Sequence, residues 1–444
     1  MTDYRRLPSI DRLVAAFLAT HTAPHAVCVT QARQLVATWR QHPAHMPASF
    51  ADMVHQLSIA VMQVTHASLR RVINATGVLL QTNLGRAPLS SAAQHALTEV
   101  AASATIEYEL ESGQRGDRHR HVTHVLTQLT SAESAVAVNN NAAAILLTLA
   151  ALTSGREVIV SRSQAVEIGG GFRIPDVLKQ SGAILVEVGT TNRTYVRDYA
   201  EAITPRTAAI LCVHHSNFRI QGFTHEPHVA ELAALAQSQH IHLIDNVGSG
   251  SLLDVTPYGL LAEPLIQARV QAGADVVCFS GDKLIGGPQA GIIVGRRTII
   301  QTIARHPLMR AVRPDKLTLA ALHATLLSYV NETALSDIPV WRMISMPAAT
   351  IAARAAHIAA QLPAPWHVHP THSTIGGGAL PGETLPSWAL VCPHAHPDHL
   401  AAMFRRHHIP IIGRVQADAL WFDMRTIAPS DDTFVRDAII QLMA

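Results

Sequence analysis

The sequence predicts an α/β protein built around a mostly parallel sheet, and two observations lead to this prediction. Short β-branched runs alternate with helical stretches from residue 136 onward, which is the pattern of parallel strands joined by covering helices. The chain has 444 residues, of which 48% are apolar and 15% charged, so it can bury a large core and form two or three domains. The expected strands are 136–138, 157–160, 183–188, 208–213, 241–244, 276–279 and 291–294.

Changes of pattern along the chain predict three domains. Residues 1–68 read as short amphipathic helices separated by proline-marked loops, and they predict a small helical domain. Residues 69–316 hold the alternating strands and helices of a large domain, and residues 317–444 predict a small C-terminal α/β domain. Inside the flanking domains we expect helices over 9–19, 32–41 and 317–330, and strands over 410–412 and 419–423.

Composition and charge exclude several classes of protein. The 34 basic and 32 acidic residues leave a net charge of +2, which excludes a protein that coats a polyanion. No uncharged apolar run reaches the ~18 residues of a membrane span, and Asp11 and Arg12 interrupt any leader sequence. The cysteines are isolated in sequence, which fits a reducing compartment and argues against a zinc site. We therefore expect a cytoplasmic protein with no membrane contact.

One histidine-rich segment has the spacing of a metal site. The HxHxDH pattern of binuclear metallo-hydrolases occurs at His394, His396, Asp398 and His399. The segment lies too near the C-terminus for the further strands and ligands of that fold, and Pro397 begins a predicted helix. We therefore predict no metal.

The sharpest chemical motif is the segment from Ser280 to Gly287, which follows a predicted buried strand. It contains Lys283, one of only three lysines in the chain. At the carboxyl edge of a sheet, where ligands bind, desolvation favours the neutral amine that forms a Schiff base with an aldehyde such as pyridoxal phosphate. Ser280 is placed to hold the phosphate. The alternative, a lysine in a surface turn, fits the buried strand and the scarcity of lysine less well.

Two other strand ends carry residues that suit such a cofactor. Asn139, Asn140 and Asn141 precede a predicted helix, whose free N–H groups can bind a phosphate, although asparagines here are more often ordinary caps. Asp245 follows the strand over 241–244 and is the acid available to a pyridine nitrogen. A turn cap is an equally good interpretation of Asp245.

Arginines gather in three predicted loops. Guanidinium groups suit phosphate-like oxyanions, and several of them beside a candidate active site indicate an anionic substrate. Singly, each is better explained as a solvated or ion-paired side chain. The residues are Arg86, Arg115, Arg118, Arg120, Arg310 and Arg313.

Longer motifs spread along nearly the whole chain, and together they are specific. They lie at 74–77, 82–86, 139–144, 166–170, 172–176, 187–194, 220–223, 280–295, 310–316 and 411–414. This set resembles the bacterial selenocysteine synthases, the L-seryl-tRNA(Sec) selenium transferases, which are pyridoxal 5'-phosphate enzymes of fold type I.

The resemblance implies an architecture and a set of site residues. We expect a seven-stranded, mostly parallel sheet in the large domain, an N-terminal domain that binds tRNA, and a homodecamer assembled as a pentamer of dimers. Lys283 matches the cofactor lysine, and Asp282 matches its catalytic neighbour. The arginines that match the binding site of the donor selenophosphate are Arg86, Arg310 and Arg313, and Arg118 matches a further substrate-binding arginine.

The implied reaction converts L-seryl-tRNA(Sec) to L-selenocysteinyl-tRNA(Sec). The serine amino group displaces Lys283 from the cofactor, and the freed amine is the base for the α-proton. Loss of the β-hydroxyl leaves a cofactor-bound dehydroalanyl-tRNA, to which selenium from selenophosphate adds. A second hypothesis is an α,β-eliminating lyase acting on a small amino acid or amino-sugar acid. The helical segment 1–68 favours the transferase, because such paralogues tend to lack a tRNA-binding domain.

Three positions differ from the family pattern. Asn246 stands where the family has the acid for the pyridine nitrogen, and Asp245 lies one residue earlier, so which of them faces the ring stays open. His215 and Ser163 stand where the family commonly has threonine and glycine. The other residues expected at the cofactor are His214 and Gln164, and Gln164 is the candidate for covering the ring.

Overall fold

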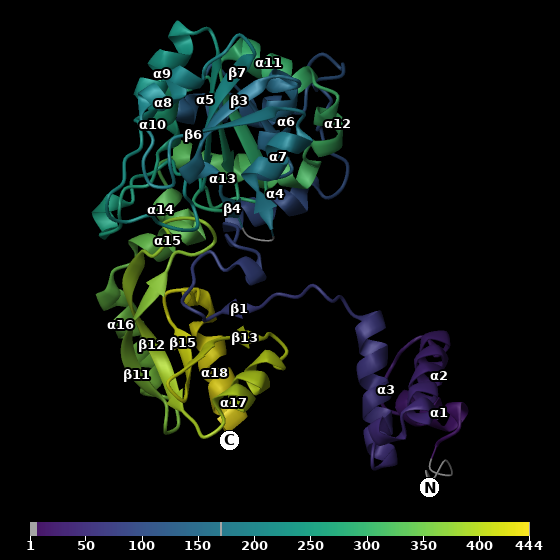
Figure 1. Cartoon of the computed structure of the whole chain (residues 1–444). Coiled ribbons are helices and arrows are strands. Elements are labelled where there is room, and N and C mark those ends of the chain that lie inside the picture. Colours follow the sequence, from purple (N-terminus) through teal and green to yellow (C-terminus); the bar gives the residue numbers. More distant parts are fainter. Residues whose placement is uncertain (1–6, 169–170, 444) are drawn as a thin grey trace. The chain divides into compact units, whose positions relative to one another are not determined.

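The computed structural model describes residues 7–168 and 171–443, and it divides the chain into two compact units that meet between Val72 and Ile73 (Figure 1). The first unit is a bundle of three helices whose apolar faces enclose residues such as Leu13 and Leu57. The second predicted helix starts earlier than expected, because the chain turns into it directly after Pro24. The helices are α1 (Ile10–Leu18), α2 (His25–Gln41) and α3 (Phe50–Thr65).

A seven-stranded sheet forms the centre of the second unit. Its strand order is β2-β10-β9-β8-β7-β3-β6, and β10 is the antiparallel member. The predicted mostly parallel sheet is therefore confirmed. The strands are β2 (Ser134–Val138), β3 (Glu157–Ser161), β6 (Ile184–Val188), β7 (Thr207–Val213), β8 (His242–Gly248), β9 (Val276–Ser280) and β10 (Gly291–Gly295).

Helices cover both faces of this sheet (Figure 1). Successive side chains of a strand point to opposite faces, so Leu243 packs under one layer of helices and Ile244 under the other. The Leu243 face is covered by α5 (Arg120–Thr130), α8 (Val196–Ala202), α9 (Val229–Ser238), α10 (Ile266–Gln271) and α13 (Lys316–Val330). The Ile244 face is covered by α6 (Asn141–Thr153), α7 (Ile174–Gln180), α11 (Arg297–Arg305) and α12 (Leu308–Val312).

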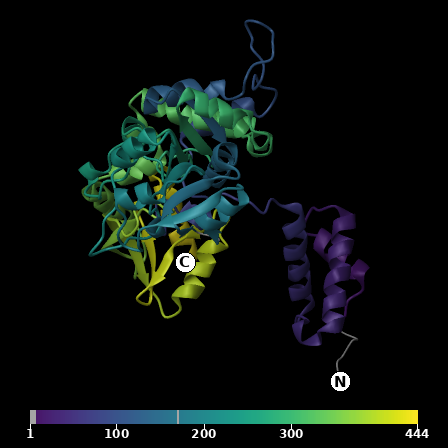
Figure 2. The same ribbon diagram turned by 45° about the horizontal axis from the view of Figure 1, so that its top comes forward.

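The helix expected over 317–330 is present as α13, and it belongs to the packing of the large sheet. It lies against α4 (Ser91–Val100) and α5, and Leu319 and Leu322 are part of the same apolar core as the strands. The predicted domain boundaries after residues 68 and 316 stay predictions. Figure 2 shows the long connection between α4 and α5, which projects from the rest of the second unit.

A smaller antiparallel sheet follows, in the order β11-β12-β15-β14. The strand expected over 419–423 is β15, whereas the β11–β12 hairpin was not predicted, because β11 lacks a regular apolar alternation. The short strands β1 (Ile73–Asn74) and β13 (Ile411–Ile412) pair in parallel beside it. The elements are β11 (His367–Thr374), β12 (Thr384–Pro393), β14 (Arg414–Gln416), β15 (Ala419–Asp423), α14 (Ala334–Asp337), α15 (Pro339–Ser345), α16 (Ala348–Ala359), α17 (Pro397–Arg405) and α18 (Asp432–Met443).

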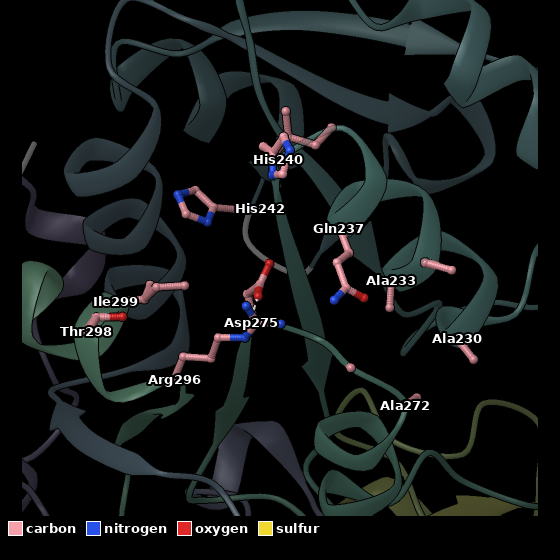
Figure 3. Close-up of a pocket in the computed structure, with 13 residues that line it drawn as sticks. Ala230, Ala233, Gln237, His240, His242, Ala272, Asp275, Arg296, Thr298 and Ile299 are labelled. Atoms are coloured by element: carbon pink, nitrogen blue, oxygen red, sulfur yellow. Dashed lines mark ion pairs between the residues drawn. The ribbon is translucent and has the colours of Figure 1, made fainter.

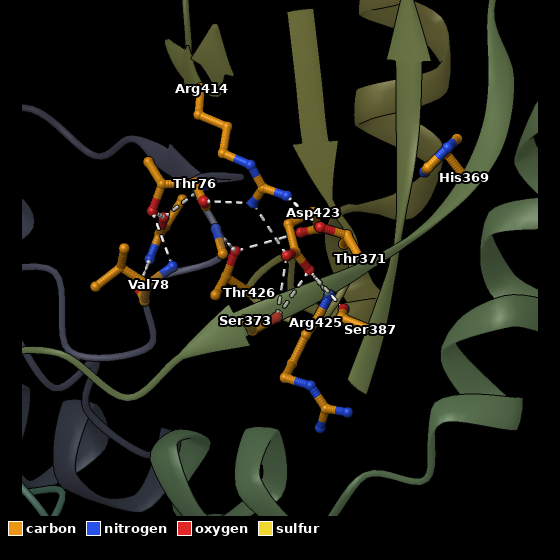
Figure 4. A network of polar contacts seen from close by, with 12 residues as sticks. Thr76, Val78, His369, Thr371, Ser373, Ser387, Arg414, Asp423, Arg425 and Thr426 are labelled. Carbon is orange, nitrogen blue, oxygen red and sulfur yellow. Dashed lines mark hydrogen bonds and ion pairs between the residues drawn. The ribbon is translucent and has the colours of Figure 1, made fainter. Parts of the chain in front are cut away.

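A buried carboxylate ties the start of the second unit to this sheet (Figure 4). Asp423 is fully buried and lies 3.2 Å from Nη1 of Arg414, which also donates to the carbonyl of Thr76 at 2.9 Å. A Cβ on Gly77 would stand 2.4 Å from Oδ2 of Asp423, so this position requires glycine. The network fixes the segment that leads into the rest of the second unit.

Neither a membrane-spanning helix nor a metal-binding cluster occurs in the described part of the chain. Across residues 7–168 and 171–443, no helix is long and apolar enough to cross a membrane. Within the same ranges, no three His, Cys, Asp or Glu side chains are grouped so as to hold a metal ion. The histidine-rich segment leads into α17, which starts at Pro397 as predicted.

Candidate active site

Several strand ends bring the expected functional residues to one edge of the large sheet. The strands β2, β3, β7, β8 and β9 run in the same direction, so their carboxyl ends meet at this edge. In open α/β sheets this is the edge that binds ligands. The residues at or just after these ends are Asn139–Asn141, Ser163, Gln164, His214, Asp245, Asn246, Ser280 and Lys283.

Lys283 lies in the turn after β9 and is 6% exposed. Burial is the main reason that the pKa of its amine falls to about 8, and the Arg86 guanidinium lowers it further, whereas Asp282 and Glu263 act in the opposite direction. Its Nζ donates to the carbonyl of Gly378 at 3.4 Å. A substantial neutral fraction of the amine is therefore present near pH 8.

The loop that receives this amine connects β11 to β12 and needs its glycines. Gly378 has φ +78°, and a Cβ there would stand 3.0 Å from Nζ of Lys283. Gly377 has φ +62°, and a Cβ there would stand 2.7 Å from the carbonyl of Leu80. A side chain at either position would strain the backbone and press on its neighbours, so the glycines keep the space around the amine open.

The neighbour of the lysine is held by an arginine from a distant segment. Nη1 of Arg86 lies 2.7 Å from Oδ2 of Asp282, and the N–H of Ala87 donates to the Asp282 carbonyl at 3.2 Å. Arg86 adopts φ +63°, directly after Gly85 at φ +92°. The segment 82–86 is thus placed against the lysine turn, which brings two residues of the predicted site together.

A second group of residues surrounds the start of α6. Asn140 caps this helix, since its side chain accepts from the N–H of Ala143 at 2.8 Å. Gly291 pairs with Val138 on one side and with Ser280 on the other, so the helix start and Ser280 flank the same glycine. A Cβ on Gly291 would stand 2.1 Å from the Asn140 carbonyl, which explains the need for glycine.

Asp245 and Asn246, the two candidates for the residue that faces the pyridine nitrogen, lie on opposite faces of β8. Oδ1 of Asn246 accepts from Nδ2 of Asn141 at 2.9 Å, on the face covered by α6. Asp245 points to the face covered by α10, where its Oδ2 lies 3.6 Å from Nε of Arg269 and burial raises the pKa of its carboxyl to about 6. The register shift between β8 and β9 comes after Asn246, so it does not turn Asp245 toward α6.

Sequence reasoning missed an acid close to the lysine. Glu263 comes from the loop before α10, is 8% exposed and accepts from Oγ of Ser249. Its Oε1 also lies 3.9 Å from Nδ1 of His214, but burial lowers the pKa of His214 to about 4, so this contact is not an ion pair near neutral pH. No local pattern marks Glu263, because its partners are distant in sequence.

His215 and Ser163, the two other residues that differ from the family pattern, contact each other. Nε2 of His215 donates to the backbone carbonyl of Ser163 at 2.8 Å. Gln164 is 8% exposed, and its amide accepts from the N–H of Val213 at 2.9 Å and donates to Glu226 at 3.0 Å. These contacts hold the turn after β3 against the end of β7. Of the motif at 166–170, Gly169 and Gly170 lie outside the described residues.

Two of the predicted substrate arginines converge on one carboxylate. Arg118 donates to Glu107, and Nη1 of Arg313 lies 3.7 Å from Oε1 of the same residue. Arg115 also reaches Glu107, at 2.8 Å. The hydrogen bond from Arg118 is the main reason that the pKa of Glu107 lies below its usual range.

The segment of Arg310 and Arg313 lies beside the start of α6. The carbonyl of Val312 accepts from the N–H of Asn139 at 2.8 Å. Arg310 is exposed, and no ion pair holds it among the residues that the structure describes. The segments of Arg86 and Arg313 thus lie beside residues of the carboxyl edge, and Arg118 is linked to Arg313 through Glu107.

Comparison with known proteins identifies the family. A family model described as L-seryl-tRNA selenium transferase matches residues 72–428. The chain belongs to this family. A curated L-seryl-tRNA(Sec) selenium transferase of Moorella thermoacetica is 44% identical over 457 residues, covering 99% of this chain and 97% of that protein. Another from Geobacter metallireducens is 42% identical over 465 residues, covering the whole of both chains.

A solved structure supports the fold. The structure titled D-glucosaminate-6-phosphate ammonia-lyase has a TM-score of 0.60 and 20% identity, and it covers 86% of this chain and 97% of its own. At this identity the likeness concerns the fold alone. The predicted resemblance and fold type are confirmed.

The L-seryl-tRNA selenium transferases are a family of pyridoxal phosphate enzymes, and the carboxyl edge of this member fits that cofactor. Lys283 offers a buried amine with a lowered pKa to an aldehyde. Ser280, which is 5% exposed, offers a hydroxyl donor at the end of β9, and the start of α6 offers backbone N–H groups. Polar groups and a helix start thus stand where an anionic group needs donors.

A large cavity of this family member lies at the opposite edge of the sheet (Figure 3). It measures about 530 Å³ and is lined by His242 and Asp275, which lie at the amino ends of β8 and β9. A cavity of about 390 Å³ borders Gln164, His214 and Asp245, and one of about 250 Å³ borders Gly376–Gly378. The chemistry of the lining residues, rather than volume, therefore points to the carboxyl edge.

Proposed function

We propose that this chain converts L-seryl-tRNA(Sec) to L-selenocysteinyl-tRNA(Sec), with selenophosphate as the selenium donor. The observation that carries the proposal is the buried Lys283 amine at the carboxyl edge of the sheet. The chain is 42 to 44% identical, over almost its full length, to curated transferases named for this reaction. Both the reactive group and its surroundings suit chemistry at the α-carbon of an amino acid.

Pyridoxal phosphate, when bound, withdraws electrons from the α-carbon of an amino acid joined to it. Lys283 would hold its aldehyde carbon, and Ser280 with Asn140 and Asn141 at the start of α6 would hold its phosphate. Around the ring we place the five remaining predicted residues. These are Gln164, His214, Asn246 and, beside the lysine, Asp282, together with Asp245, which lies behind them on the α10 face of β8 and faces Arg269 rather than the ring.

Lys283 would act as the base for the seryl group. In its neutral form Nζ accepts the α-proton, and the β-hydroxyl takes up a proton and leaves as water. The selenium of selenophosphate then forms a bond with the β-carbon, and water cleaves its bond to phosphorus, so that phosphate leaves. Asp282 is 5% exposed, and its ion pair with Arg86 holds its side chain next to the lysine turn. The buried surroundings exclude water from the amine.

The arginines would bind the donor. Selenophosphate is an oxyanion, and guanidinium groups bind such groups through paired N–H donors. We assign this role to Arg86, Arg310 and Arg313, with Arg118 as a further substrate contact. Glu107 balances the charge of Arg118 and Arg313 in the described structure, so the donor competes with this carboxylate for them.

We further propose that residues 1–68 bind the tRNA, that 69–316 form the cofactor-binding domain and 317–444 the small domain, and that the chain assembles as a homodecamer. The independent packing of the three-helix bundle supports a separate binding role for the first segment. A pentamer of dimers is the assembly that the family resemblance implies.

The experiment is incubation of the purified full-length protein with pyridoxal phosphate and seryl-tRNA(Sec), with and without selenophosphate. The amino acid released from the tRNA is then identified by mass spectrometry. Donor-dependent selenocysteine is the expected result. Unchanged serine, from protein that still binds the cofactor, would refute the proposal and favour a lyase acting on a small amino acid or amino-sugar acid.

A further inference from the structure

Glu263 is a buried acid that lacks a cationic partner in direct contact. Its side chain is 3% exposed, and among the described residues no lysine or arginine nitrogen lies within ion-pair distance of it. Burial raises the pKa of its carboxyl, because the charged form loses its hydration. Since such burial costs free energy, a role in the site is the better explanation for its position.

The contacts of Glu263 lead to the lysine turn. Its Oε1 accepts from Oγ of Ser249, which is fully buried. The backbone carbonyl of Ser249 accepts from the N–H of Leu284 at 3.3 Å, directly after Lys283. A short hydrogen-bonded path thus joins the acid to the segment that carries the amine.

Of the charged side chains that act on Lys283, Glu263 is the one without an ion pair to a lysine or arginine among the described residues. Arg86 and Asp282 both act on the lysine, but they form an ion pair at 2.7 Å, so their effects largely cancel. Glu263 and Lys283 act on each other with opposite signs, and Arg269 on α10 also lowers the pKa of Glu263. The remaining titratable neighbour, His214 at the end of β7, has a pKa of about 4 and is neutral near pH 7.

We propose that Glu263 is a positioning residue for Lys283: it holds Ser249, whose backbone carbonyl binds the lysine turn, and its negative charge favours the protonated amine. This inference rests on the proposed function for the identity of the cofactor and the step it serves. In that step the proton leaves the α-carbon and binds Nζ, and the electron pair stays with the substrate. Glu263 exchanges no proton itself but stabilises the ammonium that forms.

The test is a pH titration of the visible absorbance of pyridoxal phosphate bound to the full-length protein. Glu263→Gln keeps the shape and the acceptor oxygen but removes the charge. The absorbance reports protonation of the Lys283 nitrogen that is joined to the cofactor. Without the negative charge this protonation is less favourable, so we expect the midpoint to move to lower pH by roughly one unit. An unchanged midpoint in Glu263→Gln would overturn the proposal.

Glu383→Gln is the matched control. Glu383 is also largely buried, is held by Arg219 at 2.6 Å and by the N–H of Leu261 at 2.7 Å, and does not act on the pKa of Lys283. Its midpoint should equal that of the unmodified protein. A shift of the same size in this variant would show a general effect of removing a carboxylate, and it would also overturn the proposal.

Ser249→Ala provides an independent variant if Glu263→Gln fails to fold. Loss of the hydroxyl removes a hydrogen bond that lowers the pKa of Glu263, so more of the acid is neutral and the midpoint should move in the same direction, by less. An unchanged midpoint there would contradict the proposal. Selenocysteine formation by the unmodified protein is measured in parallel. If the midpoint shifts in the variants but the unmodified protein makes no selenocysteine, the proposed function is refuted and this inference stands.

Discussion

The two edges of the large sheet both carry buried polar and charged side chains, but they differ in how completely these side chains are hydrogen-bonded or ion-paired. At the amino edge, Asp275 lies 2.9 Å from Nε of Arg296 and accepts from the N–H of Leu243 at 2.8 Å. At the carboxyl edge, the amine of Lys283 has one hydrogen bond, at 3.4 Å, and Oδ1 of Asn141 has no partner among the residues described. The cavity of about 530 Å³ belongs to the first edge, where the charges are already matched.

This difference teaches that the pairing of the charged side chains distinguishes the two edges better than cavity size does. Buried polar groups without good partners lower stability, and they persist where a ligand supplies the missing contact. The matched pair at the amino edge instead serves the fold. Substitutions at the carboxyl edge should therefore change activity, and those at the amino edge should change stability.

The largest effect is expected for Lys283→Ala. Without the amine, the protein should lose the visible absorbance of bound pyridoxal phosphate, and selenocysteine formation should fall to background, because both need a nucleophilic nitrogen at this position. Absorbance spectra and mass spectrometry of the released amino acid check this. Lys316→Ala is the control, since Nζ of Lys316 donates to the carbonyls of Ala101 and Ala102. Turnover by Lys283→Ala would place the active site elsewhere.

A smaller effect on activity is expected for Arg313→Ala. Loss of a charge-assisted contact to selenophosphate, about 1.5 to 3 kcal/mol, should lower kcat/KM for the donor roughly ten- to a hundredfold. The cofactor absorbance should be unchanged, because Lys283 is intact. Arg305→Ala, at the exposed end of α11, should leave the donor kinetics unaltered. Equal donor dependence in both variants would rule out a role of Arg313 in binding selenophosphate.

At the amino edge we expect Asp275→Ala to lower stability and to leave activity unchanged. The variant leaves the N–H of Leu243 unpaired, which should lower the free energy of unfolding by about 1 to 3 kcal/mol without changing kcat. Urea denaturation and steady-state kinetics measure the two quantities. Thr298→Ala, which lines the same cavity, should unfold at nearly the same urea concentration as the unmodified protein. A loss of turnover in folded Asp275→Ala would break the distinction between the edges.

The smallest effect is expected for Asn246→Asp, which sharpens the comparison within the carboxyl edge. A carboxylate on the α6 face strengthens protonation of the ring nitrogen, so turnover should rise by roughly three- to tenfold. Asp245→Asn should change it less than about twofold, because Asp245 faces Arg269 on the other side. The initial rate of selenocysteine formation decides between them. Equal changes in the two variants would contradict the assignment of faces.

Local sequence patterns were sufficient for the parts of the site that depend on neighbours in the chain. Lys283 was found because a buried strand and a glycine-rich turn surround it, and Asn140 was found as the cap of α6. The alternation of side chains along β8 predicted that Asp245 and Asn246 point to opposite faces. It did not predict which face meets α6, because that depends on how the strand is covered.

Contacts between distant segments were beyond local reasoning. Glu263 is recognised only through Ser249 and the lysine turn, and Glu107 only through the arginines that it holds. The loop of the β11–β12 hairpin carries the glycines beside Lys283. This hairpin was missed because polar residues along β11 leave no regular alternation of apolar and polar side chains. Each of these depends on tertiary packing, which a single sequence does not display.

The most direct test is the pKa of Lys283 in the cofactor-free full-length protein. The rate of covalent labelling of this amine is followed against pH, and the labelled peptide is quantified by mass spectrometry. We expect a midpoint of about 8, because burial disfavours the charged amine at the carboxyl edge. A midpoint near about 10.4, the ordinary value for lysine, would contradict it.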